Sequence, residues 1–412
     1  MGKKYNLKAP KMVYILGEEM TRYGMELVLE KWVKPFVDTS SWQFFDLSVK
    51  HRDETKDKVL KDVIEAGKKV KSVFKEPTIT PTDDQKKEFG LKNTLGSPNG
   101  AMRKGWNGIT ISRDTIHVDG LKQGFKHKVI FDRQAIGGEY FAGAKIVGKG
   151  KSKTIFYPEN GGEPVIVDER ELKDSQSALV TYDNPYDSTE KLAHYFFDRC
   201  LQAKVIPYIV TKKTVFKWQE PFWQIMKKVF DAGYKEKFKK LGLLDHTKGE
   251  LAHLISDSAT MQIVKWTDGG FGMVSHNYDG DVLTDLISQI HGSPGFITSV
   301  LTGVADDGSY IKEFEASHGT VSDMYKRKLH NEETSLNPVG MIEALASAME
   351  HAGKLESEAS YKQVKVFTDA MMDSLYKIMM SPKGTRDIAG KTGSTTEVFV
   401  DLVAGEIAKI LL

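Results

Sequence analysis

The sequence contains a single cysteine, Cys200, among its 412 residues. One cysteine excludes a framework of intrachain disulfides and is typical of a reducing compartment. Because Cys200 lies in an amphipathic helical pattern over 192–201, we expect it to be a small core residue.

An excess of one charge is also missing, since 58 Lys and Arg stand against 56 Asp and Glu. This balance gives no electrostatic reason to expect binding to nucleic acid or to an anionic membrane.

Long hydrophobic runs are absent as well. No apolar stretch reaches the ~18 residues that a membrane-spanning helix needs, so we expect no transmembrane segment. The first residues, Met1-Gly-Lys-Lys, have no apolar core of the kind that a secretory signal carries. The sequence therefore predicts a cytoplasmic protein. The alternative is a protein of the mitochondrial matrix whose transit peptide has been removed.

Two common nucleotide-binding motifs are incomplete. Residues 143–150 have the spacing of a P-loop, but Gly150 stands where a hydroxyl for Mg²⁺ is required. We interpret this segment as a mobile loop, and the mismatch argues against a nucleoside triphosphatase. Residues 269–272, Gly-Gly-Phe-Gly, lack the dinucleotide fingerprint and are expected only to open a strand. A nicotinamide cofactor remains compatible with the sequence if another loop binds it.

Strand-like and helix-like patterns alternate along the chain, which predicts the α/β class. Two further short strands, 153–157 and 164–168, are joined by a turn rich in Asn and Gly, and another strand follows at 178–182. The remaining strands are expected at 13–16, 44–46, 129–131, 205–210 and 271–274, and the helices at 19–32, 57–70, 190–203, 222–240, 340–351, 361–380 and 397–411.

An acidic cluster follows the strand predicted at 271–274. We expect this strand to end in a tight turn at Asp279-Gly280 and a helix to begin directly after it. Asp281 and Asp285 are four residues apart, so both carboxylates leave the same face of that helix. Two neighbouring negative charges repel each other unless a cation lies between them, and oxygen ligands are typical of Mg²⁺ or Mn²⁺. An acidic first turn that favours the helix dipole is the alternative interpretation.

Eight segments in fixed order connect this cluster to a known family. A further acidic residue, Asp257, lies upstream of the cluster. Together the segments resemble the isocitrate and isopropylmalate dehydrogenases, and among these the homodimeric isocitrate dehydrogenases shared by eukaryotes and some bacteria. The segments are 17–22, 78–81, 97–103, Arg133 with Tyr140, 211–214, 277–285, 318–321 and 334–338. Each is weak alone, but eight in order are specific.

The resemblance implies a particular division of the chain. Residues 1–106 and 292–412 would form a discontinuous large domain, and 107–137 with 185–291 a small domain. Residues 138–184 would form a β-rich clasp that pairs with a second subunit. The expected fold is therefore the α/β isocitrate/isopropylmalate dehydrogenase fold, in a homodimer with shared active sites.

The resemblance also implies the roles of individual residues. Asp281 and Asp285 of one subunit, with Asp257 of the other, would hold Mg²⁺ or Mn²⁺. Lys212 would assist removal of the alcohol proton, and Tyr140 would protonate the carbon that loses CO₂. Arginine forks suit the carboxylates of the substrate, and the Ser and Asn of the set favour isocitrate over isopropylmalate. The substrate-binding set is Thr80, Ser97, Asn99, Arg103, Arg113 and Arg133.

A loop near residue 320 is expected to bind the adenosine half of the cofactor. Family members that use NADP⁺ carry Arg-His in this loop, and here the positions hold Asp323 and Met324. A carboxylate accepts hydrogen bonds from a free ribose 2′-hydroxyl and repels a 2′-phosphate, so the sequence predicts NAD⁺. The alternative is that Asp323 only caps a helix that begins at Met324. The cofactor-binding set is His318, Gly319, Thr320, Val321, Asp323 and Asn337.

The predicted activity is the oxidation of isocitrate by NAD⁺ to 2-oxoglutarate, CO₂ and NADH. Two alternatives remain open at this point: the same reaction with NADP⁺, and a non-catalytic regulatory subunit. The sequence also departs from the usual family pattern at Glu18, Gln85 and Gln134, which indicates a divergent branch.

Overall fold

The computed structural model describes residues 5–412, and the chain folds as two compact units. Among the described residues, the main unit comprises 5–136 and Tyr186–Leu412, and the second unit, which we call the clasp, comprises Gly137–Pro185. The expected division of the main unit into a large and a small domain remains a prediction. Each unit is described by itself below.

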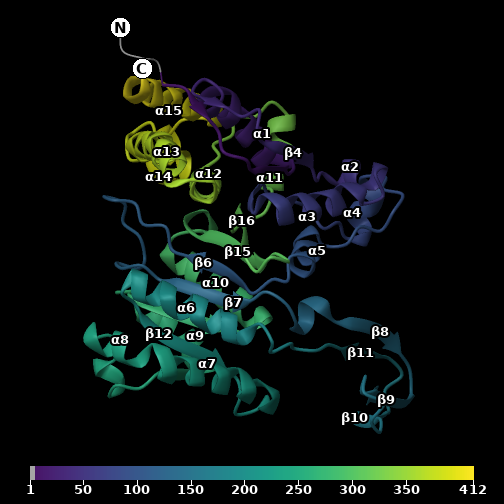
Figure 1. The fold of residues 1–412 in the computed structure, drawn as a ribbon. Coiled ribbons are helices and arrows are strands. Elements are labelled where there is room, and N and C mark those ends of the chain that lie inside the picture. Colours follow the sequence, from purple (N-terminus) through teal and green to yellow (C-terminus); the bar gives the residue numbers. More distant parts are fainter. Residues whose placement is uncertain (1–4) are drawn as a thin grey trace. The chain divides into compact units, whose positions relative to one another are not determined.

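A ten-stranded mixed sheet runs through the main unit (Figure 1). Its strands follow the order β13-β12-β14-β7-β6-β15-β16-β5-β2-β4. Their bounds are β2 Val13–Leu16, β4 Gln43–Asp46, β5 Ser72–Lys75, β6 Thr110–Asp114, β7 Ile130–Gln134, β12 Ile206–Thr211, β13 Ala252–Ile255, β14 Phe271–Ser275, β15 Thr298–Val304 and β16 Tyr310–Ala316. A separate pair joins β1 Leu7–Lys8 to β3 Val37–Asp38.

The sheet consists of two parallel blocks that run in opposite directions. Strands β13, β12, β14 and β7 are parallel to one another, and so are β16, β5, β2 and β4. Strands β6 and β15 join the blocks through antiparallel ladders. Because β6 therefore runs in the same direction as β5 and β16, the carboxyl ends of these three strands meet at one edge of the sheet.

Helices cover both parts of this sheet, and the alternating pattern confirms the α/β class. The predicted C-terminal helices are confirmed, although the helix expected over 222–240 is interrupted at Tyr234. The bounds are α1 Glu19–Val28, α2 Val49–Glu54, α3 Lys58–Val70, α4 Asp83–Glu88, α5 Pro98–Gly105, α6 Thr189–Ala203, α7 Glu220–Gly233, α8 Lys235–Lys240, α9 Ser256–Lys265, α10 Asn277–His291, α11 Ser322–Leu329, α12 Val339–Glu356, α13 Glu358–Met379, α14 Arg386–Ala389 and α15 Thr396–Leu411.

Separate hydrophobic clusters hold these layers together. The largest joins α1, α12, α13 and α15 to the β2 and β5 side of the sheet. In Figure 1 these C-terminal helices lie together above the sheet, at the end of the main unit that also carries α1. A second cluster packs α6 and α7 against β12 and β14, and it contains Cys200, which is fully buried. The prediction that Cys200 is a core residue is confirmed.

The start of α10 differs from the sequence prediction. The prediction of a tight turn at Asp279-Gly280 is wrong, because the helix already begins at Asn277, two residues after β14 ends. Asp281 therefore lies beyond the first turn. The glycine at 280 serves close packing rather than a turn, since a β-carbon there would overlap the Cβ of Arg133 on β7. Val282, the next residue but one on this helix, is 52% exposed.

The clasp consists of two antiparallel strand pairs. Strand β9 Gly150–Phe156 pairs with β10 Val165–Leu172, which confirms the two short strands predicted there. Strand β8 Gly143–Val147 pairs with β11 Ser177–Thr181. The interpretation of 143–150 as a mobile loop is therefore wrong, because the alternating side chains of Lys145, Ile146 and Val147 extend along a paired strand.

Candidate functional site

A cavity of about 240 Å³ opens where the carboxyl ends of β5, β6 and β16 meet. Helix α10 and the loop after β16 complete its wall. The charged and polar residues of five separate segments converge on it, so this edge of the sheet is the candidate active site. The lining residues are Lys75, Pro77, Thr78, Asn99, Arg113, Asp281, Asp285, Glu315, Ala316, Ser317, His318 and Gly319.

Two arginines reach the paired carboxylates of α10 in this cavity. Arg113 lies on β6 and Arg133 on β7, and the register Ile111↔Arg133 places both side chains on the same face of the sheet. Arg113 Nη1 lies 3.1 Å from Asp281 and 3.2 Å from Asp285. Arg133, which is 1% exposed, also forms an ion pair with Asp281. The predicted arginines and the helix carboxylates therefore form one charge cluster.

The spacing of the two carboxylates follows directly from the helix. Residues four apart on α10 present Asp281 and Asp285 on one face, as predicted. Burial raises the pKa of Asp285, and the charge of Asp281 adds to this effect, although Arg113 opposes it. Arg113 Nε is buried and has no hydrogen-bond partner among the described residues, so the guanidinium keeps a donor for a further anion.

Helix α5 delivers part of the predicted substrate-binding set. Asn99 lines the cavity, and its buried Oδ1 has no hydrogen-bond partner within residues 5–412. Ser97 is the N-cap residue, and its hydroxyl accepts a hydrogen bond of 3.2 Å from the amide of Gly100. Arg103 is buried farther along the helix. Ser97, Arg103 and the exposed Thr80 do not line the cavity.

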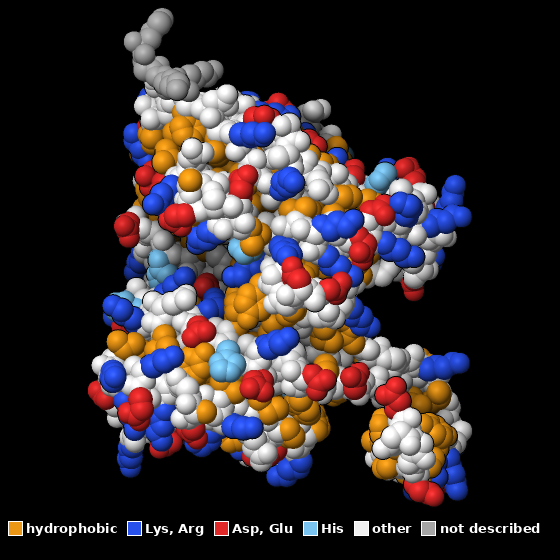
Figure 2. All heavy atoms as spheres, in the orientation of Figure 1, with side chains coloured by type: hydrophobic (Ala, Val, Ile, Leu, Met, Phe, Trp, Pro, Cys, Tyr) orange, Lys and Arg blue, Asp and Glu red, His pale blue; other side chains and the backbone are white. Residues whose placement is uncertain are grey.

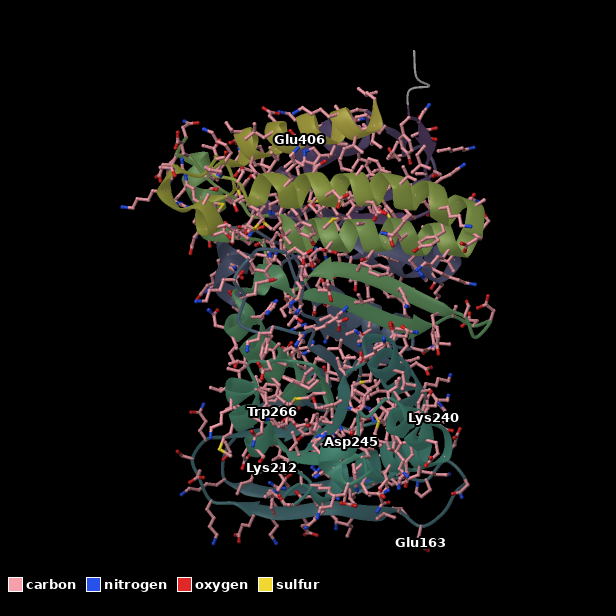
Figure 3. All side chains as sticks on the ribbon, turned by 90° about the vertical axis from the view of Figure 1, so that its left-hand side faces the viewer. Glu163, Lys212, Lys240, Asp245, Trp266 and Glu406 are labelled. Atoms are coloured by element: carbon pink, nitrogen blue, oxygen red, sulfur yellow. The ribbon has the colours of Figure 1, made fainter. Side chains whose placement is uncertain are left out.

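Lys212 and Asp257 form a second charged group. They follow the parallel strands β12 and β13, and Lys212 Nζ donates to Asp257 Oδ2. This hydrogen bond holds the pKa of Asp257 below its usual range. Neither residue lines the cavity. Figure 3 labels Lys212 in the lower part of the main unit, whereas Glu406 on α15 lies at the upper end. Tyr140 lies in the clasp, in a 3-10 turn, and is 46% exposed.

The predicted cofactor-binding residues follow β16. His318 and Gly319 line the cavity, and the ring of His318 contacts the carbonyl of Gly319 at 2.8 Å through Nδ1. Burial lowers the pKa of His318, which favours the neutral ring. Helix α11 begins at Ser322, so Asp323 lies in its first turn and is exposed. The interpretation of Asp323 as the cap of a helix that begins at Met324 is therefore wrong.

The last residue of the cofactor-binding set, Asn337, lies farther along the chain than the loop at 318–321. Asn337 donates from Nδ2 to Asp387 at 2.8 Å and accepts from the amide of Val339 at 3.1 Å. Thr320 is buried, and Val321 adopts a left-handed backbone conformation. These contacts fix Asn337, whereas the loop of residues 318–321 leads directly into α11.

The sequence analysis missed a buried ion pair at the base of the cavity. Lys75 Nζ donates to Glu315 Oε2, and Lys75 is only 1% exposed. Burial raises the pKa of Glu315, but Lys75 and Arg103 outweigh this effect and lower it overall. A signal was present at Lys75, because this residue ends the buried strand β5, where an unpaired charge would be costly.

The donor set of α10 fits a hard divalent cation. Asp281 and Asp285 offer only oxygen atoms, and their arginine partners show that the site accommodates positive charge. Within the described residues no group of three His, Cys, Asp or Glu side chains could hold a metal on its own. Ligands from a substrate or a second chain would therefore have to complete the coordination.

These features of the site indicate the class of protein. Arginines that surround paired carboxylates, beside a loop that leads from a sheet edge into a helix, are typical of α/β enzymes that bind small polycarboxylates. The sequence model of the isocitrate/isopropylmalate dehydrogenase family matches residues 12–403. The chain belongs to this family, and the predicted relationship and fold are confirmed.

Similar proteins narrow the comparison within the family. The mitochondrial NAD⁺ isocitrate dehydrogenase 1 of Phaeodactylum tricornutum is 56% identical over 98% of this chain and 75% of the relative. The mitochondrial NAD⁺ isocitrate dehydrogenase of Ostreococcus tauri is 57% identical over 97% of this chain and 85% of the relative. A crystal structure of isocitrate dehydrogenase from Ostreococcus tauri, with isocitrate and magnesium(II), aligns with a TM-score of 0.93 over 97% of this chain and 100% of its own, at 56% identity.

Proposed function

We propose that this protein oxidises isocitrate to 2-oxoglutarate and CO₂, with reduction of NAD⁺ and with Mg²⁺ or Mn²⁺ as the metal. The observation that carries the proposal is the convergence of Arg113 and Arg133 on Asp281 beside Asp285. A similar protein, 56% identical, was crystallised with isocitrate and magnesium(II). The similar NAD⁺-dependent enzymes cover nearly the whole of this chain.

The arginines bind and orient the substrate. Their planar guanidinium groups form paired hydrogen bonds with carboxylates, and Arg103, Arg113 and Arg133 provide three such groups. A substrate carboxylate that takes over these donors releases Asp281 and Asp285 for a cation. A bound divalent cation supplies positive charge that favours the alkoxide and polarises the keto group. The unpartnered Asn99 Oδ1 offers an acceptor for the hydroxyl of the substrate.

Two further residues transfer protons in this proposal. Lys212 assists removal of the alcohol proton, and Tyr140 donates a proton to the carbon from which CO₂ departs. Lys212 is paired with Asp257 in its own chain and lies outside the cavity. We therefore propose that Lys212 and Asp257 serve the cavity of a second subunit, in a homodimer with shared active sites.

Exposed apolar side chains support this dimer. On α9, Met261 and Val264 are 59% and 55% exposed, and on α10 Tyr278 and Val282 are 48% and 52% exposed. The clasp carries its own apolar surface, visible as orange spheres in Figure 2. Exposed apolar patches mark association sites in proteins. The clasp residues are Ile146, Ile155, Phe156, Tyr157, Val165, Ile166, Val167 and Val180.

Mixed dimers test the shared site. Lys212→Met and Asp281→Asn chains should each be inactive, because each lesion damages both sites of its own homodimer. A hybrid dimer places both lesions in one site and leaves the other intact, so activity should return to up to half of the wild-type value per hybrid. Native mass spectrometry should first establish that subunits have exchanged. Exchanged hybrids without activity would contradict the shared site.

We infer that NAD⁺ is the cofactor because Asp323 places an exposed carboxylate in the first turn of α11. Both similar enzymes described above carry NAD⁺ in their names. The decisive experiment measures kcat/KM for isocitrate oxidation with NAD⁺ and NADP⁺ side by side at saturating Mg²⁺. A higher value for NADP⁺ would contradict the cofactor assignment. No turnover with either would indicate a regulatory subunit instead.

We also propose a mitochondrial location, because both similar enzymes are named as mitochondrial. The cytoplasmic expectation has no support among them. None of the described helices has the length and apolar character of a membrane span. Fractionation of the source cells, with matrix and cytosolic marker enzymes, tests the location directly.

A further inference from the structure

Helix α11 begins from an unfavourable backbone conformation. Its N-cap residue, Val321, has φ 58° and ψ 50°, in the left-handed region. The β-branched side chain of valine clashes with the backbone in this region, and such residues persist only where the surroundings impose the conformation. The amide of Tyr325 donates to the carbonyl of Val321 at 3.1 Å, so this residue directs the first turn of the helix.

Glu19 supplies the contacts that impose this conformation. The hydroxyl groups of Thr320 and Ser322, on either side of Val321, both donate to Glu19 Oε2. Thr320 is 7% exposed, so its hydroxyl lies largely away from water. A charged acceptor that receives two hydroxyl donors binds them more strongly than a neutral one. The carboxylate thus bridges the residues before and after the strained position.

Glu19 is itself held in an unusual place. It is the first residue of α1, and its own φ of 56° is left-handed. Gly17, two residues earlier, lies so close to the carbonyl of Pro77 that a β-carbon would overlap it. A second contact joins the same two helices, since Lys328 on α11 lies 3.8 Å from the ring centre of Tyr23 on α1. The carboxylate therefore projects from a rigid support.

We infer that Glu19 is a positioning residue for the NAD⁺ loop. Its two hydrogen bonds fix the left-handed turn at Val321, and this turn sets the direction in which Asp323 leaves α11. The loop is therefore already ordered in the free protein. Because no further conformational entropy is lost when it closes around the cofactor, binding is stronger. This inference rests on the proposed function, because it concerns the loop that binds the dinucleotide in that proposal.

Substitutions at Glu19 test the inference through binding. Glu19→Ala removes both acceptors and should raise the dissociation constant for NADH and the KM for NAD⁺ about tenfold. The KM for isocitrate should change less than about twofold, because the arginine cavity is untouched. Glu19→Gln keeps an acceptor oxygen and should recover part of the affinity. NADH fluorescence gives the dissociation constant without turnover.

A second substitution distinguishes positioning from general stabilisation. Glycine adopts a left-handed conformation without strain, so a chain with Val321→Gly depends less on the carboxylate. Glu19→Ala should therefore weaken NADH binding about tenfold with Val321 in place, but less than about threefold in the Val321→Gly chain. Amide hydrogen exchange over 318–329 should rise in Glu19→Ala and remain unchanged elsewhere. Ser322→Ala, which removes a single donor, provides a milder variant if Glu19→Ala does not fold.

The controls separate this inference from the proposed function. Glu30→Gln alters an exposed carboxylate that pairs with Lys34, and it should leave NADH binding unchanged. An equal effect of Glu19→Ala in both Val321 backgrounds, or an unchanged NADH dissociation constant, overturns the positioning role. A wild-type enzyme that binds NADH but does not oxidise isocitrate overturns the proposed reaction alone, because the binding cycle is still measurable.

Discussion

Glu76 should make the stability of this protein fall as the pH rises from 5 to 8. The residue follows β5 and is completely buried. Its Oε1 accepts a hydrogen bond of 2.8 Å from the hydroxyl of Tyr14, and its Oε2 accepts one of 2.8 Å from the amide of Gly17. Burial nevertheless dominates these contacts and raises the pKa of Glu76 to about 8.

The sign and size of the effect follow from linkage. In the unfolded chain the pKa of a glutamate lies near 4.5, so the unfolded state releases the proton that the folded state retains. Between these pKa values the folded state binds more protons, and the free energy of unfolding falls by up to about 1.4 kcal/mol for each pH unit. From pH 5 to 8 this amounts to at most about 4 kcal/mol. Below the unfolded pKa the effect disappears.

Glu76→Gln should remove this dependence. The amide resembles the protonated carboxyl, since its oxygen accepts from the amide of Gly17 and its NH₂ group donates to the hydroxyl of Tyr14. Burial also raises the pKa of Glu18 to about 7 and of Glu313 to about 8, so the variant keeps part of the pH dependence. The difference between wild type and Glu76→Gln isolates the contribution of Glu76.

Urea unfolding at pH 5, 6, 7 and 8, at fixed protein concentration, measures this difference. The variant should gain stability over wild type as the pH rises, by about 1.4 kcal/mol per pH unit at most. The control is Glu30→Gln, an exposed carboxylate on the surface after α1. Parallel curves for wild type and Glu76→Gln would refute the reasoning, because they would show that Glu76 has the same pKa in both states.

Three further variants test the site. Asp281→Asn should leave the fold intact but weaken Mn²⁺ binding and lower activity about 100-fold or more, and near-normal rates at limiting Mn²⁺ would contradict the metal assignment. Gly280→Ala should cost about 1–3 kcal/mol of stability, because the new methyl group meets Arg133; an unchanged unfolding free energy would show that α10 can shift. Asp323→Arg with Met324→His should move the kcat/KM ratio towards NADP⁺ about 100-fold, and an unchanged ratio would show that the cofactor is selected elsewhere.

Local patterns predicted the elements well where apolar periodicity was strong. The long helices after residue 338 and the buried strands β12 and β14 appear close to their expected positions. The predicted start of α10 was wrong, because Asp279-Gly280 has the local signal of a turn. A glycine is needed at position 280 because Arg133 on the neighbouring strand β7 leaves no room for a β-carbon. This contact joins residues that are distant in sequence, so no local pattern indicates it.

The candidate site was predictable to a similar degree. The resemblance placed Arg113, Arg133, Asp281 and Asp285 in one site, and the structure brings these four together. The role of Glu19 escaped the sequence analysis, since its partners Thr320 and Ser322 lie some 300 residues away along the chain. Roles that require a second subunit, such as that of Lys212, remain predictions because they depend on contacts between chains.

The clasp has a consequence for how this protein responds to dilution. Its strands form two separate two-stranded ribbons, and most of the side chains on them are exposed. An isolated two-stranded ribbon is marginal in water, so we expect this segment to draw its order from the second chain of the proposed dimer. The order of the clasp should then depend on the protein concentration. At concentrations below the dimer dissociation constant, proteases should cut within 143–181 first, and isocitrate turnover should disappear together with the intact clasp.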